Sequence, residues 1–287
     1  MPRAIRASNT KLYPVRAASG GVVHGAIVTF WLNRPAARVR ADVRDASGRL
    51  VWTAPRVTGQ AGMNRFVWDL RSTKPPAWKF TPAWNNYYDA GPPVLPGTYT
   101  VEVRAGALAL RAPVTVKQDP RTRWTAAQLR ARYAMERELY GDYARVDRAL
   151  NLLGTVVREA PLRVRALRRP GEGSTALAVA QAAAAAKVLM ASITSNPRND
   201  QDNDFLQDML RERLQTQIDA SGGTFAPPTQ PEARETAVLH ALANERLEAV
   251  RRFVAGGLRS VDARLRAAKV PPLTHLTRKP EMHKPNG

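Results

Sequence analysis

The chain has 287 residues, is 44% hydrophobic and carries 44 basic against 24 acidic side chains, a net charge of +20. This length and composition predict a folded protein with a sizeable core and two domains. The absence of cysteine excludes disulfides, thiolate metal sites and a cysteine nucleophile.

The net charge raises the hypothesis of nucleic-acid binding, because basic side chains gain affinity by displacing counterions from phosphates. Residues 1–120 carry 17 basic and 6 acidic side chains, and residues 121–287 carry 27 and 18, so neither half concentrates the excess. No basic stripe with interleaved aromatic residues is present. Nucleic-acid binding is therefore kept as a minor alternative.

The N-terminal stretch 1–25 is expected to be an irregular leader, since proline and glycine interrupt any periodicity. No apolar run approaching the roughly 18 residues of a membrane helix stands out in the sequence. The start also lacks the apolar core of a secretory signal. With Met1 as the true start, these features predict a cytoplasmic protein without a membrane span.

Short alternating segments follow, from which we expect an antiparallel β-sandwich of immunoglobulin-like architecture over residues 26–118. The clearest strand is 62–71, in which Phe66, Trp68 and Leu70 share one face. The other expected strands are 26–32, 38–44, 50–52, a segment around Tyr99–Arg104 and a returning segment over 108–116. Asp119-Pro120 ends this region, because proline cannot continue a strand ladder.

Beyond it the apolar period changes to about 3.6, which predicts an antiparallel helical bundle over residues 122–268. Thr125 with Gln128, and Thr229 with Glu232, have the spacing of capping boxes at two helix starts. A helix capped by Ser174 and a further one over about 203–220 are expected between them. The proline-rich tail 269–287 is expected to be disordered.

The loop between residues 72 and 95 holds five aromatic residues within eleven positions: Trp78, Phe80, Trp84, Tyr87 and Tyr88. Exposed, they would form a binding loop for a protein partner or for sugar rings, because aromatic side chains present broad apolar area at low entropic cost. Buried, they would pin the loop onto the sandwich or the bundle. The sequence leaves both alternatives open.

No catalytic or metal-binding set is apparent, and no cofactor motif occurs. Asp200, Asp202 and Asp204 alternate like the start of a calcium loop, but Phe205 and Arg211 stand where glycine and glutamate are needed. The sandwich carboxylates each have an ordinary structural explanation, with Asp42 and Glu102 on outward strand faces. We therefore predict a non-catalytic protein.

Three segments together, 62–71, 91–101 and 114–121, resemble the C-terminal region of large bacterial proteins with a sortilin-type, BNR-repeat β-propeller, commonly described as glycosyl hydrolase-like. The resemblance also takes in 25–32, 197–206 and 226–229. It implies an accessory module that packs against a propeller in trans or another protein partner, located outside the cytoplasm. It implies as alternatives a divergent glycosyl hydrolase or a polysaccharide-binding protein.

The chain departs from this family in lacking propeller repeats, in which the family's sugar chemistry would reside. No catalytic residue is therefore carried over from the resemblance.

Overall fold

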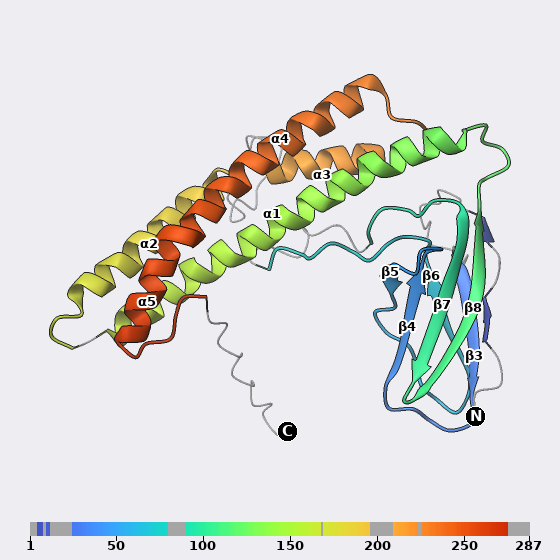
Figure 1. Cartoon of the computed structure of the whole chain (residues 1–287), viewed down its shortest axis with the longest axis horizontal. Coiled ribbons are helices and arrows are strands. Elements are labelled where there is room, and N and C mark those ends of the chain that lie inside the picture. The colour runs from blue at the N-terminus through green and yellow to red at the C-terminus, as the bar shows by residue number, and fades with distance from the viewer. Residues whose placement is uncertain are drawn as a thin grey trace, which may run out of the picture. The chain divides into compact units, whose positions relative to one another are not determined.

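A computed structural model of the chain describes residues 5–7, 10–11, 25–79, 90–167, 169–195, 209–222 and 226–274 (Figure 1). The chain forms two compact units, each assembled from separate stretches of sequence. The first comprises Met1–Pro75, Tyr88–Tyr140 and Gln217–Thr236, and the second comprises Pro76–Tyr87, Gly141–Thr216 and Ala237–Gly287.

The first unit contains two sheets (Figure 1). The smaller has the strand order β1 (Ile5–Ala7), β3 (Ala26–Leu32) and β6 (Gly62–Trp68). The larger has the order β2 (Thr10–Lys11), β8 (Leu108–Lys117), β7 (Gly97–Ala105), β4 (Val39–Arg44) and β5 (Leu50–Thr53). Neighbouring strands pair antiparallel, apart from β2, which runs parallel to β8.

One core joins the inward faces of both sheets. Alternation along β3 and β6 buries Val28, Phe30, Phe66 and Trp68, and β4, β7 and β8 contribute valines and Tyr99 to the same cluster. The Trp68 ring meets the Tyr99 ring edge-on, with 5.2 Å between centroids. The apolar alternation of the sequence therefore brings residues from both sheets into one buried cluster.

The helices follow the strands in the chain. They are α1 (Ala126–Ala166), α2 (Gly173–Ala191), α3 (Leu210–Ser221), α4 (Gln230–Phe253), a π-helical turn η3 (Val254–Leu258) and α5 (Arg259–Ala267). In the second unit α2 packs against α5. The predicted α+β class is confirmed at this level.

Both predicted capping boxes are formed. The Thr125 N–H donates to Gln128 Oε1 at 2.8 Å and the Gln128 N–H donates to Thr125 Oγ1 at 3.3 Å. Thr229 and Glu232 exchange the equivalent pair at 2.7 and 3.3 Å. The predicted cap at Ser174 is wrong, because α2 already begins at Gly173 and Glu172 holds the preceding turn by accepting the Arg169 N–H.

Both ends of the chain differ from expectation. Residues 5–7 and 10–11, placed in an irregular leader, form edge strands, because main-chain pairing with β3 and β8 needs no side-chain periodicity. Residues 269–274, placed in a disordered tail, fold back with Val270 and Leu273 buried. Residues 275–287 lie outside the described part of the chain.

The clearest predicted strand ends earlier than its alternation suggested. β6 stops at Trp68, and Leu70 adopts a φ of 64°, in the left-handed region that a leucine seldom occupies. Leu70 nevertheless stays in the core, and its carbonyl accepts the Val94 N–H at 2.8 Å. The reversal carries Arg71 to an isolated bridge with Pro93.

A tyrosine hydroxyl secures the start of β7. Tyr99 Oη donates to the carbonyl oxygen of Leu95, four residues upstream, at 2.7 Å, and the ring is 7% exposed. Burial raises the pKa of Tyr99 far above its usual range, so the hydroxyl stays protonated as a donor. The bond fixes the loop that enters the strand.

Tyr99→Phe removes this bond and leaves the ring packed, so we expect the free energy of unfolding to fall by about 1 kcal/mol. Urea denaturation measures the change. Tyr133→Phe is the control: Tyr133 is a half-buried tyrosine of α1 that lines a common pocket with Leu95 and Tyr99, and its substitution should change stability by less than about 0.5 kcal/mol. Equal effects of the two substitutions would contradict the assignment.

Candidate binding site

The first residue of the predicted aromatic loop is buried within the second unit. Trp78 is 1% exposed, and its backbone N–H donates to Asp147 Oδ2 on α1 at 3.1 Å. Asn151, one turn along α1, accepts the Lys79 N–H at 2.7 Å and donates to the Ala77 carbonyl at 2.9 Å. For Trp78 the structure therefore supports the pinning alternative. Phe80, Trp84, Tyr87 and Tyr88 lie outside the described residues.

Trp78 covers a fully buried ion pair. Arg211 on α3 and Asp147 are both 0% exposed, and Arg211 Nε donates to Asp147 Oδ1 at 2.7 Å. The guanidinium carbon lies 5.3 Å from the Trp78 ring centroid and 5.0 Å from that of Tyr143. Arg211 also donates to the Tyr143 hydroxyl at 2.6 Å.

This cluster has the character of a structural anchor. Desolvation raises the pKa of Asp147, while the Arg211 guanidinium opposes the rise. Removing either charge would leave the other buried without its partner, which is the costly situation for buried ion pairs. Tyr143 and Asp147 lie one turn apart on α1. Nothing local in the sequence indicated that Arg211 would join them.

Trp78→Ala opens a cavity in this core and removes one face of the cation–π contact, so we expect a loss of about 3 to 5 kcal/mol in unfolding free energy. Thermal and urea unfolding measure it. Trp31→Ala offers a matched control, since Trp31 is 44% exposed, and should cost less than about 1 kcal/mol. A Trp78→Ala protein as stable as Trp31→Ala would show that the loop does not contribute to the core.

Two carboxylates lie side by side on the outward face of the larger sheet. Asp42 on β4 is the register partner of Glu102 on β7, and both are almost fully covered. Arg40 donates to both Asp42 oxygens at 3.0 and 2.9 Å, and the Thr53 hydroxyl adds a bond of 2.7 Å. Glu102 is held by Arg104 and Arg111.

The chemistry of this pair differs from that of a glycosidase. Such enzymes need one carboxyl with a raised pKa to protonate the leaving group. Hydrogen bonding from Arg104 instead lowers the pKa of Glu102, and Arg111 adds to the effect. The outward placement of both residues was expected, but their covering by arginine side chains was not. They form a charge ladder across the strands.

A further buried carboxyl lies on α1 in the first unit. Glu136 is 2% exposed, and its Oε1 has no hydrogen-bond partner in the described part of the chain. One turn earlier, Arg132 makes a two-pronged ion pair with Glu232 at 3.0 and 3.1 Å. Burial raises the pKa of Glu136 to about 7, against weaker opposite effects of Arg132 and Arg71.

One turn after Glu136, burial raises the pKa of Tyr140 to about 12. Arg71, from the turn after β6, forms a side-chain hydrogen bond with Tyr140. The face of α1 from Arg132 to Tyr140 is thus polar and buried. Of these residues, Glu136 is the one whose ionised form destabilises the folded state, because its carboxylate is buried.

Glu136→Gln should remove a pH dependence of stability. The native pKa of about 7 exceeds the usual 4.5, so the native state binds the proton more tightly and wild-type stability falls as pH rises between these values. We expect the variant to be more stable by up to about 3 kcal/mol near pH 8, and close to wild type near pH 4.5.

Unfolding free energies across this pH range provide the measurement. Glu138→Gln, on an exposed residue of the same helix, should show no such divergence. Parallel pH profiles for wild type and Glu136→Gln would contradict the assignment.

An exposed apolar pair stands on the outward face of the smaller sheet. Trp31 on β3 and Met63 on β6 are register partners, and they are 44% and 73% exposed. Trp31 Nε1 donates to Asn33 Oδ1 at 3.1 Å, which fixes the ring orientation. Arg65 is exposed on the same face of β6 as Met63. We call Trp31, Met63 and Arg65 the outer patch.

The composition of the outer patch is that of a protein interface. Tryptophan, methionine and arginine are enriched at the centres of interfaces, where a preset aromatic ring contributes most. Gly62, beside the ring, has a φ of 93°, which favours glycine; a Cβ added there would lie at an ordinary contact distance of 3.9 Å from Trp31 Cη2. From the sequence, Trp31 was predicted only as part of the strand 26–32; its odd position on a strand whose even positions fill the core was the available signal.

A pocket of about 290 Å³ lies at one end of the strands, between the Asp45–Arg49 turn, the 94–99 loop and Tyr133 of α1. Asp45 is committed to the turn, where its Oδ1 accepts from Ser47 Oγ at 2.6 Å and its Oδ2 from Arg49 Nε at 3.0 Å. The Tyr99 hydroxyl is likewise occupied by Leu95. The side chains of Asp45 and Tyr99 in this pocket are therefore engaged in holding the turn and the loop in place.

Among the described residues α2 is long and apolar enough to cross a membrane by length and composition, with a mean hydropathy of 1.4. This helix was predicted from the sequence, but not as a candidate membrane span. Nine of its nineteen residues are alanine, and Val179, Ala182 and Ala186 are buried. Such a helix gives weak evidence for a membrane, and the predicted absence of a span stays a prediction.

Within the same described ranges, no group of three or more histidine, aspartate or glutamate side chains could hold a metal ion. The alternating aspartates 200, 202 and 204 lie outside those ranges.

A scan against models of known protein families gives no match, and a search of curated proteins gives no similar sequence. The resemblance to propeller-associated C-terminal regions therefore stays a hypothesis based on the three segments quoted for it.

Proposed function

We propose that the chain is a non-catalytic interaction module that binds a protein partner through the outer patch of the smaller sheet. The observation that carries the proposal is the exposed cross-strand pair of Trp31 and Met63, with the indole held by Asn33. A ring fixed before binding loses little entropy when a partner covers it. In this proposal the aromatic residue that binds the partner is Trp31, whereas the sequence had suggested the loop that begins at Trp78.

The finer architecture belongs to the same proposal: an immunoglobulin-like sandwich followed by an antiparallel helical bundle. The shared core of the two sheets supports the sandwich. The Tyr99–Leu95 bond supports the immunoglobulin-like form, since a tyrosine at a strand start that bonds to the backbone upstream recurs there. The sequence resemblance adds that the partner is a β-propeller in trans or another protein.

Structural use of the carboxylates favours binding over hydrolysis. Asp42 and Glu102 are neutralised by arginines, and Asp147 is paired with Arg211. Glu136 on α1 has a pKa suited to proton transfer, but its side chain is only 2% exposed and so is closed to a substrate. These four groups have structural explanations that leave the outer patch as the surface for function.

A photo-crosslinking amino acid at position 63, introduced in the source organism, should capture the partner directly. With that partner purified, Trp31→Ala is expected to weaken binding by at least about tenfold, because an interface tryptophan commonly contributes 2 kcal/mol or more. Titration calorimetry measures the affinity.

Leu108→Ala is the matched control, because Leu108 is 48% exposed on β8, and it should change affinity by less than about twofold. Unchanged binding of the Trp31→Ala protein, with folding verified by circular dichroism, would refute the proposed surface. Hydrolysis of a glycan panel by the purified chain would instead favour the enzyme alternative.

A further inference from the structure

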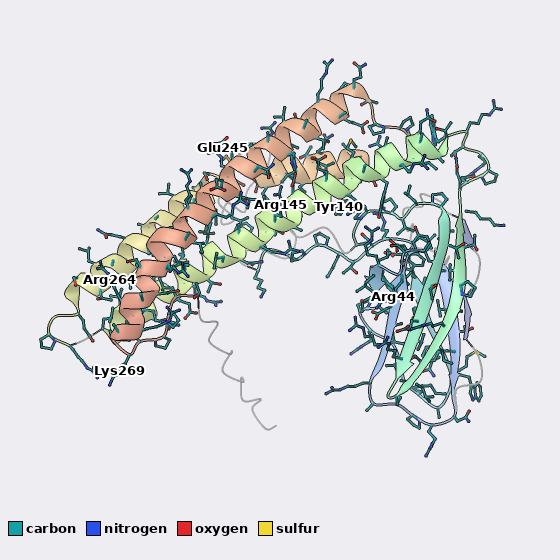
Figure 2. The ribbon with its side chains drawn as sticks, viewed as in Figure 1. Arg44, Tyr140, Arg145, Glu245, Arg264 and Lys269 are labelled. Atoms are coloured by element: carbon teal, nitrogen blue, oxygen red, sulfur yellow. The ribbon has the colours of Figure 1, made fainter. Side chains whose placement is uncertain are left out.

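A cleft lies in the second unit, between residues 254 and 274, and it includes no residue of the outer patch. After α5 the chain reverses at Lys269, which has a φ of 59° (labelled in Figure 2), and the Val270 N–H donates to the Leu265 carbonyl at 2.8 Å. Asp262 pins the returning segment by accepting the Leu273 N–H at 2.7 Å and the Thr274 hydroxyl at 2.9 Å. These two bonds hold residues 270–274, which we call the fold-back, against α5.

The cleft has a volume of about 390 Å³. Its apolar lining comes from the π-helical turn η3, and its polar lining comes from α5 and from residue Thr274 of the segment that folds back. The lining residues are Val254, Ala255, Leu258, Arg259, Asp262, Arg266 and Thr274.

The net charge of the lining side chains is positive, with Arg259 and Arg266 against Asp262. Arg259 and Arg266 are exposed, and in the described part of the chain neither takes part in an ion pair. Seven residues of helix place them on one face, roughly 10 Å apart along the axis. The Asp262 carboxylate is 4% exposed, with both oxygens engaged by the fold-back. Two guanidinium groups are thus free to converge on one anion.

The helical turn beside the cleft contains two glycines that lower its helix propensity, although the packing leaves room for larger residues. η3 contains Gly256 and Gly257, and each glycine costs about 1 kcal/mol relative to alanine within a helix. A Cβ at Gly256 would meet no atom within 4 Å, and one at Gly257 would lie 3.8 Å from the Phe253 ring, an ordinary contact. Close packing therefore does not explain the glycines. Single π turns inside helices occur frequently at functional sites.

We propose that this cleft binds a small organic oxyanion, a phosphate ester or a carboxylate, between Arg259 and Arg266. The planar guanidinium groups suit such oxygens, which they can bind in pairs of parallel hydrogen bonds. The apolar part of the ligand lies against Val254, Ala255 and Leu258. This site is independent of the proposed partner binding.

Calorimetric titration of the full chain with phenyl phosphate and with benzoate tests the site, the two probes distinguishing phosphate from carboxylate. Binding of at least one is expected, and inorganic phosphate, which lacks an apolar part, should bind more weakly. Arg259→Gln and Arg266→Gln should each weaken binding about tenfold. Ala255→Trp, which fills the cleft without changing charge, should abolish it.

Arg264→Gln is the matched control, because Arg264 is exposed on the same helix (Figure 2) but does not line the cleft. It should leave affinity within about twofold of wild type. An equal loss in Arg264→Gln would indicate general charge attraction and overturn the site. Failure of both probes to bind at millimolar concentration, with unfolding curves showing intact protein, would also overturn it.

Discussion

The buried charge of Arg211 is the constraint on which the second unit depends. A guanidinium group removed from water must be matched by a carboxylate and by further hydrogen bonds, or the folded state becomes unfavourable. Asp147 supplies the charge, Tyr143 a hydroxyl and a ring face, and Trp78 the second ring face. Three stretches far apart in the chain must therefore assemble at one point. That requirement selects one arrangement of α1, α3 and the segment around Trp78 over other packings of the same apolar faces.

Local sequence patterns were enough to predict most of the strands and two of the helix starts. Alternation of apolar residues predicted β3, β4, β6, β7 and β8 to within a few positions, because a half-buried strand imposes a period of two on its side chains. The two capping boxes were visible as Thr-x-x-Gln and Thr-x-x-Glu, and both are formed. The same rules failed at residues 5–7 and 10–11, where pairing is through the main chain and leaves little trace in side-chain pattern.

The candidate sites depended on contacts that a linear pattern does not encode. Trp78 and Phe80 looked alike in sequence, and only the position of Asp147, 69 residues later, decides that Trp78 is core. In the sequence, Arg211 stood out only because it replaces the glutamate that a calcium loop needs. Its structural role follows from its contacts with Asp147 and Tyr143 on α1. Glu136 sits on a stripe flanked by apolar residues, so its unusual proton affinity follows from burial that the sequence alone does not reveal.

The order of these partners along the chain has a consequence for synthesis on the ribosome. Trp78 emerges 69 residues before Asp147, and Asp147 a further 64 before Arg211. At roughly 5 to 20 residues per second, the indole waits about 7 to 27 seconds for the last of its partners to be translated. During that interval a large aromatic side chain is available to chaperones and to neighbouring nascent chains. The indole thus gains its last partner only once Arg211 on α3 has been translated, well after the part of α1 that carries Asp147.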